Sequence, residues 1–416
     1  METYEEYKES GIPWVGKIPS HLNWARTHYL LRFEKGKLPE ETNKSGEGMP
    51  YIGATDLDSE GECETFTTDT TLPETDGNDL LVLWDGARAG ISGTGKQGKL
   101  SSTVVKVIPA DEIKSRFLYW YYQGLQPYVL DQVNGTTIPH MSRRYFDDIG
   151  IINWNYAEQE AIADYLDAKT AEIDGIVEET ERSVELLREY RRSVISEAVI
   201  KGLDPHAPMK DSGVDWIGEI PEGWQLMPYK HVASVRANLV HPEDYLDLMQ
   251  VAPENIEKDT GRLLGCKPVS ETSVASDNHK FEKGVILYSK VRPALNKVTI
   301  APFDGLCSAD MYPIETMHDK RWLVYFMLSK AFCEQVVVST NRVKMPKLNK
   351  EELGNMRVIL PNADEQLEIA DYLDTKTAEI DSLIADKERQ VELLKEYRKS
   401  LISEAVTGKF EVPGLE

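Results

Sequence analysis

Side chains that can donate hydrogen bonds occur beside turn-forming residues at four places in the sequence. Arginine, lysine, histidine and asparagine suit both the phosphate oxygens and the base edges of a nucleic acid. The candidate contacts are Arg88, Lys96, Lys99, His140, Arg143, Arg144, Lys290, Arg292, Asn296, Lys297, Asn341, Arg342, Lys344 and Lys347. Because the forked guanidinium of arginine matches guanine, we assign Arg88, Arg292 and Arg342 to base reading and the lysines to phosphate. Each cluster taken alone could also be ordinary solvent-exposed surface. Arg88 and Arg292 could instead serve only to stabilise the ends of their strands.

Known catalytic motifs fail on inspection. Gly90, Gly95 and Lys96 match the phosphate-binding pattern GxxxxGK, but Gln97 stands where a magnesium-binding serine or threonine is required. The residues that follow predict a strand rather than the helix whose N-terminus would hold phosphate. The sequence contains no HExxH, no GxSxG and no (N/D)PP(Y/F/W) tetrapeptide, and its four cysteines have no CxxC spacing. We therefore expect no catalytic site, no metal site and no cofactor in this chain.

The segments that must position these side chains form an internal repeat. Residues 158–199 return as residues 365–406, with roughly 29 of 42 positions identical. A second echo pairs SGIPWVGKIP at residues 10–19 with SGVDWIGEIP at residues 212–221. The chain is therefore predicted to consist of two copies of one unit, each a lead-in, a middle region and a helix.

Apolar residues in both repeated segments step by alternating threes and fours, which predicts a coiled-coil seam. The seam residues are Ile173, Val177, Val184, Leu187, Val194, Ile380, Ile384, Val391, Leu394 and Leu401. About 44 helical residues at ~1.5 Å each would give a rod of ~65 Å. Two nearly identical long helices favour an antiparallel pair, although each could also pack only on its own domain. Polar residues at Thr180, Arg191, Lys387 and Arg398 could set the register of the pair or reach solvent.

The middle regions diverge in sequence but share a pattern of short strands and buried helices, which predicts two α+β globules. The expected boundaries are a lead-in at 1–24, a globule at 25–152, a helix at 153–203, a linker and second lead-in at 204–224, a globule at 225–358 and a helix at 359–416. The formal net charge of the 416 residues is −23, which excludes a uniformly basic nucleic-acid binder. The polar N-terminus and the absence of apolar runs near ~18 residues predict no membrane segment, and the scattered cysteines fit a reducing cytoplasm.

These motifs, in this order, resemble the specificity subunit of Type I restriction-modification systems. The resemblance is carried by WIGEIPEGW at Trp216, GTTIPHMSRRYFDDIGI at Gly135, EQxxIAxxL at Glu158 and Glu365, TAEID at Thr170 and Thr377, and LLREYRRSVISEAVIKGL with its second copy. It covers essentially the whole chain. It implies two globular target recognition domains separated by two long antiparallel coiled-coil helices, an internal tandem duplication with pseudo-twofold symmetry.

The resemblance also implies the partners. Each target recognition domain would read one half of a bipartite, asymmetric site in double-stranded DNA, and the helices would dock two methyltransferase subunits, which restriction subunits can join. S-adenosylmethionine, ATP and magnesium would then serve those partners, and this chain would not be catalytic. The alternative is a coiled-coil adaptor whose globules bind protein partners instead of DNA.

Overall fold

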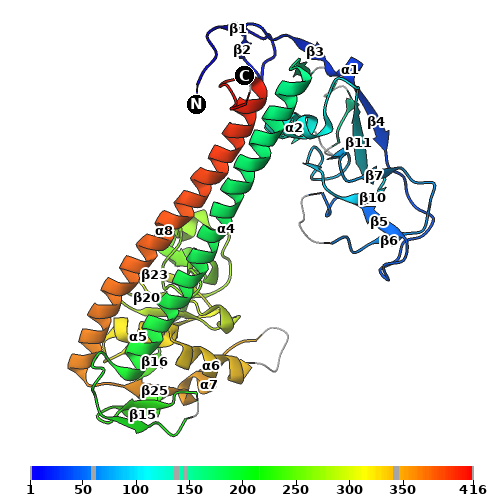
Figure 1. Cartoon of the computed structure of the whole chain (residues 1–416). Coiled ribbons are helices and arrows are strands. Elements are labelled where there is room, and N and C mark those ends of the chain that lie inside the picture. Colours follow the sequence, from blue (N-terminus) through cyan, green and yellow to red (C-terminus); the bar gives the residue numbers. More distant parts are fainter. Residues whose placement is uncertain are drawn as a thin grey trace. The chain divides into compact units, whose positions relative to one another are not determined.

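The computed structural model describes residues 2–57, 62–134, 140–143, 146, 149–214, 216–340 and 346–414. These residues form two compact units (Figure 1). Unit 1 comprises Met1–Thr180 and Arg389–Glu416, and unit 2 comprises Glu181–Glu388. Each unit therefore holds one globule together with a part of both long helices. In the described part of the chain, no helix has the length and apolar character needed to cross a membrane.

The two long helices are α4 (Tyr156–Lys201) and α8 (Ala363–Thr407). Each begins with the same reciprocal cap. The Asn155 side-chain oxygen accepts a hydrogen bond from the Glu158 amide (3.0 Å), and the Glu158 carboxylate accepts one from the Asn155 amide (2.7 Å). Asn362 and Glu365 repeat this pattern at the start of α8. The cap satisfies backbone donors that the first turn leaves without partners.

Ion pairs show that α4 and α8 lie side by side and run antiparallel. In unit 2, Arg188 contacts Glu388 and Arg191 contacts Asp381. The residue numbers therefore rise along α4 as they fall along α8. In unit 1, Arg398 contacts Asp174 at 2.8 Å. The predicted seam residues Ile173, Val177, Val184, Ile380, Val391 and Leu401 are buried, and Leu187, Val194, Ile384 and Leu394 are half-buried.

The globule of unit 1 contains short strands and one long helix. Its lead-in hairpin pairs β1 with β2, its first strand β3 pairs with its last strand β12, and its two four-stranded sheets have the orders β6-β5-β10-β7 and β4-β11-β8-β9. The bounds are β1 Tyr7–Glu9, β2 Lys17–Pro19, β3 Trp24–Arg26, α1 Thr27–Leu30, β4 Leu31–Lys35, β5 Met49–Ile52, β6 Phe66–Thr67, β7 Glu74–Asp76, β8 Leu80–Leu83, β9 Ser92–Gly93, β10 Gln97–Leu100, β11 Val104–Pro109, α2 Ser115–Asn134 and β12 Gly150–Ile152.

The globule of unit 2 follows the same plan. A lead-in hairpin pairs β13 with β14, β15 pairs with β25, and two sheets have the orders β16-β24-β21-β22 and β17-β20-β23-β18-β19. The strands are β13 Met209–Asp211, β14 Glu219–Pro221, β15 Gln225–Pro228, β16 Ala233–Val235, β17 Leu239–Val240, β18 Met249–Val251, β19 Lys267–Pro268, β20 Asn278–Phe281, β21 Ile286–Ser289, β22 Val298–Ile300, β23 Gly305–Ser308, β24 Met311–Thr316 and β25 Arg357–Leu360. The helices are α5 Lys320–Leu328, α6 Lys330–Thr340 and α7 Lys350–Asn355, with 3-10 turns η1 Tyr229–His231, η2 Pro242–Asp244, η3 Pro253–Asn255, η4 Val269–Glu271 and η5 Pro293–Leu295.

One structural detail shows that the divergent globules are copies. Each globule has one parallel strand pair among its described residues, and the paired strands occupy corresponding places in the two copies. They are β5 with β10 in unit 1, and β18 with β23 in unit 2. All other named strand pairs in the described residues are antiparallel. The α+β class and the tandem duplication expected from the sequence are confirmed.

Each globule contacts a long helix through one of its own helices, α2 in unit 1 and α5 in unit 2. An arginine of that helix contacts two aspartates that lie one turn apart on α4 or α8. The contacts are Arg116 with Asp164 and Asp167, and Arg321 with Asp371 and Asp374. The repeated ADYLD motif supplies both aspartates, so part of the identity between the helices serves contacts inside this chain.

Candidate nucleic-acid interface

The loop between β21 and β22 in unit 2 carries four predicted site residues. Its turn η5 is flanked by Arg292 and Asn296, both with φ of 44° in the left-handed region. Such backbone costs a non-glycine residue on the order of 1 kcal/mol and persists only where the surroundings hold it. The Leu295 amide donates to the Arg292 carbonyl (2.9 Å) and the Asn296 amide to Pro293 (3.0 Å). The strained loop is thereby fixed and leaves the Arg292 side chain exposed.

A second predicted cluster meets this loop. The Arg292 amide donates to the Pro346 carbonyl (3.1 Å), and the Leu348 amide donates to the Lys290 carbonyl (2.9 Å). Lys347 therefore lies beside the loop, where its ammonium contacts Asp310 at 3.2 Å. The predicted residues Asn341, Arg342 and Lys344 of this cluster lie outside the described residues.

These two segments border a cavity of about 890 Å³. Its polar and charged lining includes Gln250, Glu254, Asn255, Lys267, Ser289, Arg292, Lys297, Ser308, Asp310 and Lys347. The Lys297 ammonium is held by the Pro253 carbonyl at 2.7 Å, so this cation is fixed at the wall. Four cations against two carboxylates, among several amides and hydroxyls, make a surface suited to phosphate and base edges.

Two further lysines of unit 2, Lys290 and Lys350, act on a buried histidine of the same globule. His279 on β20 is buried, and its pKa lies below the ordinary value because burial, and then the charges of Lys290 and Lys350, disfavour the protonated ring. Lys290 itself lies over the ring of Tyr312 at 5.3 Å from its centre. Lys290 therefore adds positive charge to the part of unit 2 that holds this loop.

The equivalent place in unit 1 also joins two predicted clusters. An isolated bridge pairs Asp85 with His140, as another pairs Val291 with Lys347 in unit 2. The Asp85 carboxylate contacts His140 and Lys35, the latter at 2.7 Å. Burial opposes its ionisation, but hydrogen bonds from Lys35 and His140 outweigh burial and lower the pKa of Asp85.

Two further predicted residues lie near this junction. The exposed Arg143 places its guanidinium over the ring of Phe33, 5.6 Å from the ring centre. Arg88 is half-buried, and its guanidinium donates to the Ala54 carbonyl at 3.4 Å. The predicted Arg144 lies outside the described residues.

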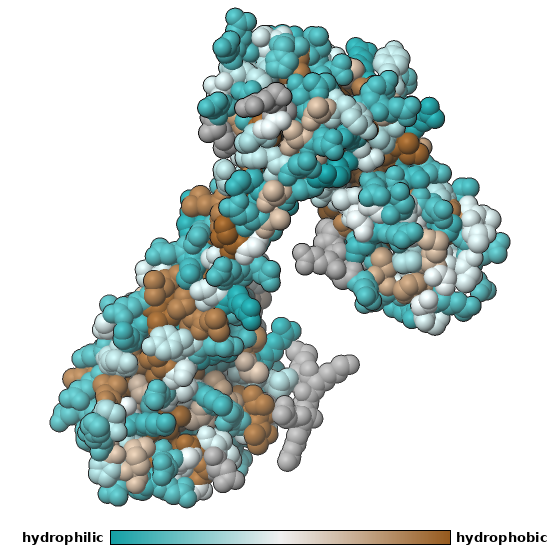
Figure 2. Space-filling view, in the orientation of Figure 1, coloured by the Kyte–Doolittle hydropathy of each residue, from teal (hydrophilic) through white to brown (hydrophobic). Residues whose placement is uncertain are grey.

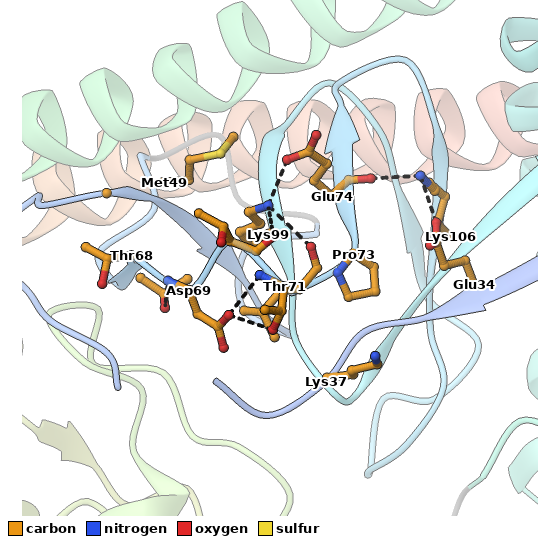
Figure 3. Close-up of a pocket in the computed structure, with 14 residues that line it drawn as sticks. Glu34, Lys37, Met49, Thr68, Asp69, Thr71, Pro73, Glu74, Lys99 and Lys106 are labelled. Atoms are coloured by element: carbon orange, nitrogen blue, oxygen red, sulfur yellow. Dashed lines mark hydrogen bonds and ion pairs between the residues drawn. The ribbon is translucent and has the colours of Figure 1, made fainter. Parts of the chain in front are cut away.

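Lys99 occupies a different environment, at the wall of a second cavity of about 800 Å³ (Figure 3). Its side chain is 8% exposed, and its ammonium donates to the carbonyls of Thr70 and Leu72 and to the Glu74 carboxylate at 2.8 Å. The hydrogen bond and charge of Lys99 lower the pKa of Glu74. With three donors used inside the globule, Lys99 has the geometry of a structural residue, and its contact with nucleic acid stays a prediction. Lys96, half-buried before β10, does not line this cavity.

Asn296 is similarly placed beneath its loop. Its side chain is buried and donates to the Leu328 carbonyl at 3.4 Å. It therefore supports the loop that presents Arg292, and a direct contact with nucleic acid also stays a prediction. Sequence reasoning missed Asp85 and Asp310, the carboxylates that contact His140 and Lys347.

Comparisons with known proteins agree with this architecture. The model of the family described as "Type I restriction modification DNA specificity domain" matches residues 30–186 and again residues 257–393, which together exceed half of the chain. The chain belongs to this family. Specificity subunits are the non-catalytic components of Type I restriction-modification complexes, and within the described residues no cluster of three potential metal ligands occurs.

Individual relatives extend the likeness to nearly the full length. The Type I restriction enzyme EcoDI specificity subunit of Escherichia coli is 28% identical over 410 residues, covering 95% of this chain and 90% of that protein. The MjaVIII specificity subunit of Methanocaldococcus jannaschii is 25% identical and covers 98% of each. A solved chain from "Structural basis underlying complex assembly and conformational transition of the type I R-M system" has a TM-score of 0.70 at 14% identity, covering 94% of this chain and 99% of that one, and shows a shared fold.

Proposed function

We propose that this specificity subunit recognises a bipartite, asymmetric site in double-stranded DNA, with unit 1 reading one half and unit 2 the other. The observation that carries the proposal is the cavity of unit 2, where two basic segments far apart in sequence meet around the exposed Arg292. Unit 1 repeats the junction at Asp85 and His140. Because the two globules share a plan but differ in sequence, they would read different bases with one docking geometry.

The chemistry divides between the arginine and the lysines. A guanidinium can bind the O6 and N7 acceptors of guanine in the major groove, and each such bidentate pair is worth about 1–3 kcal/mol of discrimination. Lys347 and Lys297 border the same cavity and would contact phosphates, which adds affinity that falls as salt rises. Arg292 is therefore the residue whose loss would change the sequence that unit 2 prefers.

A scaffold role for the helices rests on apolar side chains that both copies leave exposed. Leu186 and Tyr190 on α4 are 59% and 54% exposed, and their equivalents on α8, Leu393 and Tyr397, are both 48% exposed. The molecular face in Figure 2 is mostly hydrophilic with separate hydrophobic patches. Exposed apolar pairs at equivalent positions would dock two copies of one partner.

Those partners would be two methyltransferase subunits that bind S-adenosylmethionine and methylate an adenine in each half-site after flipping the base out of the duplex. Restriction subunits using ATP and magnesium could join them. This chain would need no cofactor. Its four cysteines are free in the structure, which suits a reducing cytoplasm.

The test measures DNA binding by the assembled complex of this chain and its methyltransferase partners. The target would first be defined by sequencing methylated adenines in host DNA with and without the gene for this chain. A bipartite methylated motif that disappears on deletion is expected. Arg292→Ala should then weaken binding to the cognate duplex by about 1–3 kcal/mol and leave a scrambled duplex unaffected.

Arg236→Ala is the matched control. Arg236 is also an exposed arginine of unit 2, but it pairs with Glu315 and does not line the cavity. Its loss should leave discrimination unchanged. Two results together would favour the adaptor alternative. The methylation pattern would not change when the gene for this chain is deleted, and the globules would bind proteins but no DNA.

A further inference from the structure

Arg191 is a charged residue buried in the seam of unit 2. It occupies a position that the heptad pattern reserves for apolar residues, and its side chain is only 6% exposed. The guanidinium binds Asp381 of α8 with two hydrogen bonds, Nε to Oδ1 at 2.7 Å and Nη2 to Oδ2 at 3.1 Å. An ion pair of this kind loses hydration on burial and gains from every further acceptor that it meets.

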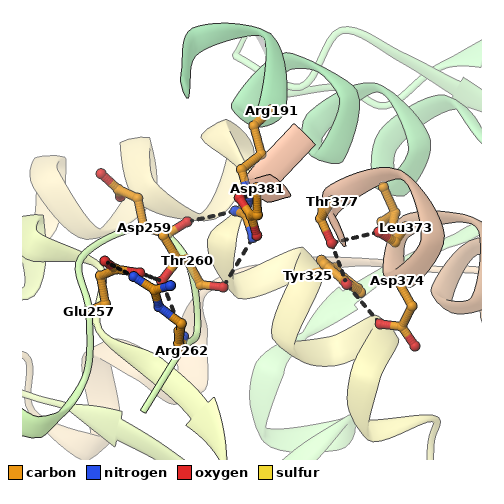
Figure 4. Close-up of polar contacts among 10 residues, drawn as sticks. All are labelled: Arg191, Glu257, Asp259, Thr260, Arg262, Tyr325, Leu373, Asp374, Thr377 and Asp381. Carbon is orange, nitrogen blue, oxygen red and sulfur yellow. Dashed lines mark hydrogen bonds and ion pairs between the residues drawn. The ribbon is translucent and has the colours of Figure 1, made fainter. Parts of the chain in front are cut away.

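The remaining acceptors come from the globule. Nη1 of Arg191 donates to the Asp259 carbonyl at 3.1 Å, and Nη2 donates to the Thr260 carbonyl at 3.2 Å (Figure 4). Asp259 adopts a left-handed φ of 61°, a turn conformation that aspartate tolerates better than most non-glycine residues. A single side chain of α4 thus binds both the partner helix and a turn of the recognition globule.

The loop, residues 257–262, is rigid in its own right. The Glu257 carboxylate accepts hydrogen bonds from the Thr260 hydroxyl and from the Arg262 guanidinium, both at 2.7 Å. The Glu257 amide also donates to the Arg262 carbonyl at 2.9 Å. A displacement of the carbonyls that Arg191 holds would therefore move the loop as one piece.

This loop contacts the strained segment that presents Arg292. The Asp259 amide donates to the Asn296 carbonyl at 3.4 Å, and Asn296 is the second left-handed residue of that segment. The contacts therefore run from α8 through Arg191 and the 257–262 loop to the wall of the cavity. Each step is a hydrogen bond, so the contacts form one continuous network between α8 and the cavity wall.

We infer that Arg191 is a positioning residue that sets the placement of the recognition loop of unit 2 on the helix pair, and so sets discrimination at one half-site. The inference rests on the proposed function for its DNA readout, but the placement of the loop can be measured without DNA. Lysine could retain the ion pair with Asp381, yet it lacks the planar fork that reaches two carbonyls at once.

Unit 1 contains a matched control. Arg398 stands at the equivalent position of α8 and pairs with Asp174, the equivalent of Asp381, at 2.8 Å. Its side chain is 28% exposed, and among the described residues its guanidinium donates to the Asp174 carboxylate and to no backbone carbonyl. Arg398→Ala therefore removes the same charge from the same kind of seam without touching the loop of unit 2.

The experiment uses the full chain assembled with its methyltransferase partners. Hydrogen–deuterium exchange would be measured over residues 255–264 and 290–298 in the wild type, Arg191→Ala, Arg191→Lys and Arg398→Ala. Binding would then be titrated on the cognate duplex and on duplexes with either half-site scrambled. The half-site affected by Arg292→Ala identifies the one that unit 2 reads.

For Arg191→Ala we expect faster exchange in both segments and a loss of discrimination of about tenfold at the half-site of unit 2 only. Arg191→Lys should fall between the wild type and alanine, and Arg398→Ala should leave this half-site unchanged. Unchanged exchange in both segments, or an equal loss at both half-sites, would overturn the inference. Failure of the wild type to prefer a bipartite duplex would contradict the proposed function instead, and the exchange result would still decide the placement.

Discussion

At the scale of single residues, burial decides whether a cation is available to a ligand. Lys99 and Arg292 look alike in the sequence, since each follows a turn beside a short strand. In the structure Arg292 is exposed at a cavity, whereas Lys99 is buried and bound by three oxygens. The difference depends on Thr70, Leu72 and Glu74, which contact Lys99 from a neighbouring segment. The local sequence around Lys99 does not predict that contact.

Lys99→Met tests this distinction. Methionine has a similar length and no charge, so the Thr70 and Leu72 carbonyls would lose their donor while Glu74 stays largely in solvent. We expect the free energy of unfolding to fall by about 1–3 kcal/mol, measured by urea titration. The dependence of DNA affinity on salt should not change, whereas Lys96→Met should lower that slope by ~1 if Lys96 contacts phosphate. A lower slope for Lys99→Met at unchanged stability would instead support a contact between Lys99 and DNA.

At the scale of elements, the helices were predictable and their docking was not. The repeat and the seam predict two long helices because a period near 3.5 is a local property of the sequence. The left-handed backbone at Arg292, and the contacts of Arg116 and Arg321 with aspartates of the long helices, depend on segments that meet only after folding. The buried Arg191 likewise has Asp381 and the 257–262 loop as partners, so the alternative that it reaches solvent is wrong.

The caps of the two long helices offer an element-scale prediction. Asn155→Ala and Asn362→Ala should each lower the free energy of unfolding by about 1 kcal/mol, because amides of the first turn lose their acceptor. The two effects should add in the double variant, since the caps share no partner. Chemical denaturation would measure all three, with the exposed Asn153→Ala as a control that should stay near the wild type. If only one of the two single variants lowered the free energy of unfolding, the N-termini of the two helices would not be equivalent.

At the scale of the whole molecule, the duplication separates what is shared from what differs. Positions that dock a globule on its helix recur in both units, as do the exposed residues Leu186 and Leu393. Internal docking explains the identity of the aspartates, whereas Leu186, Tyr190, Leu393 and Tyr397 remain about half exposed at equivalent positions. The proposed partner, meeting both copies of the helix, would account for these exposed residues.

The two exposed pairs are expected to form two separate docking sites. Because these residues are exposed, Leu186→Glu with Tyr190→Glu should leave folding intact and remove one of two methyltransferase subunits, and Leu393→Glu with Tyr397→Glu should remove the other. The mass of the purified complex, measured with partner in excess, should fall from two bound partners to one in each pair variant and to none when all four are changed. Glu178→Lys, an exposed charge change on α4, should retain two. If either pair variant released both partners together, the two sites would not be independent, and one continuous interface would have to replace the pair of equivalent surfaces.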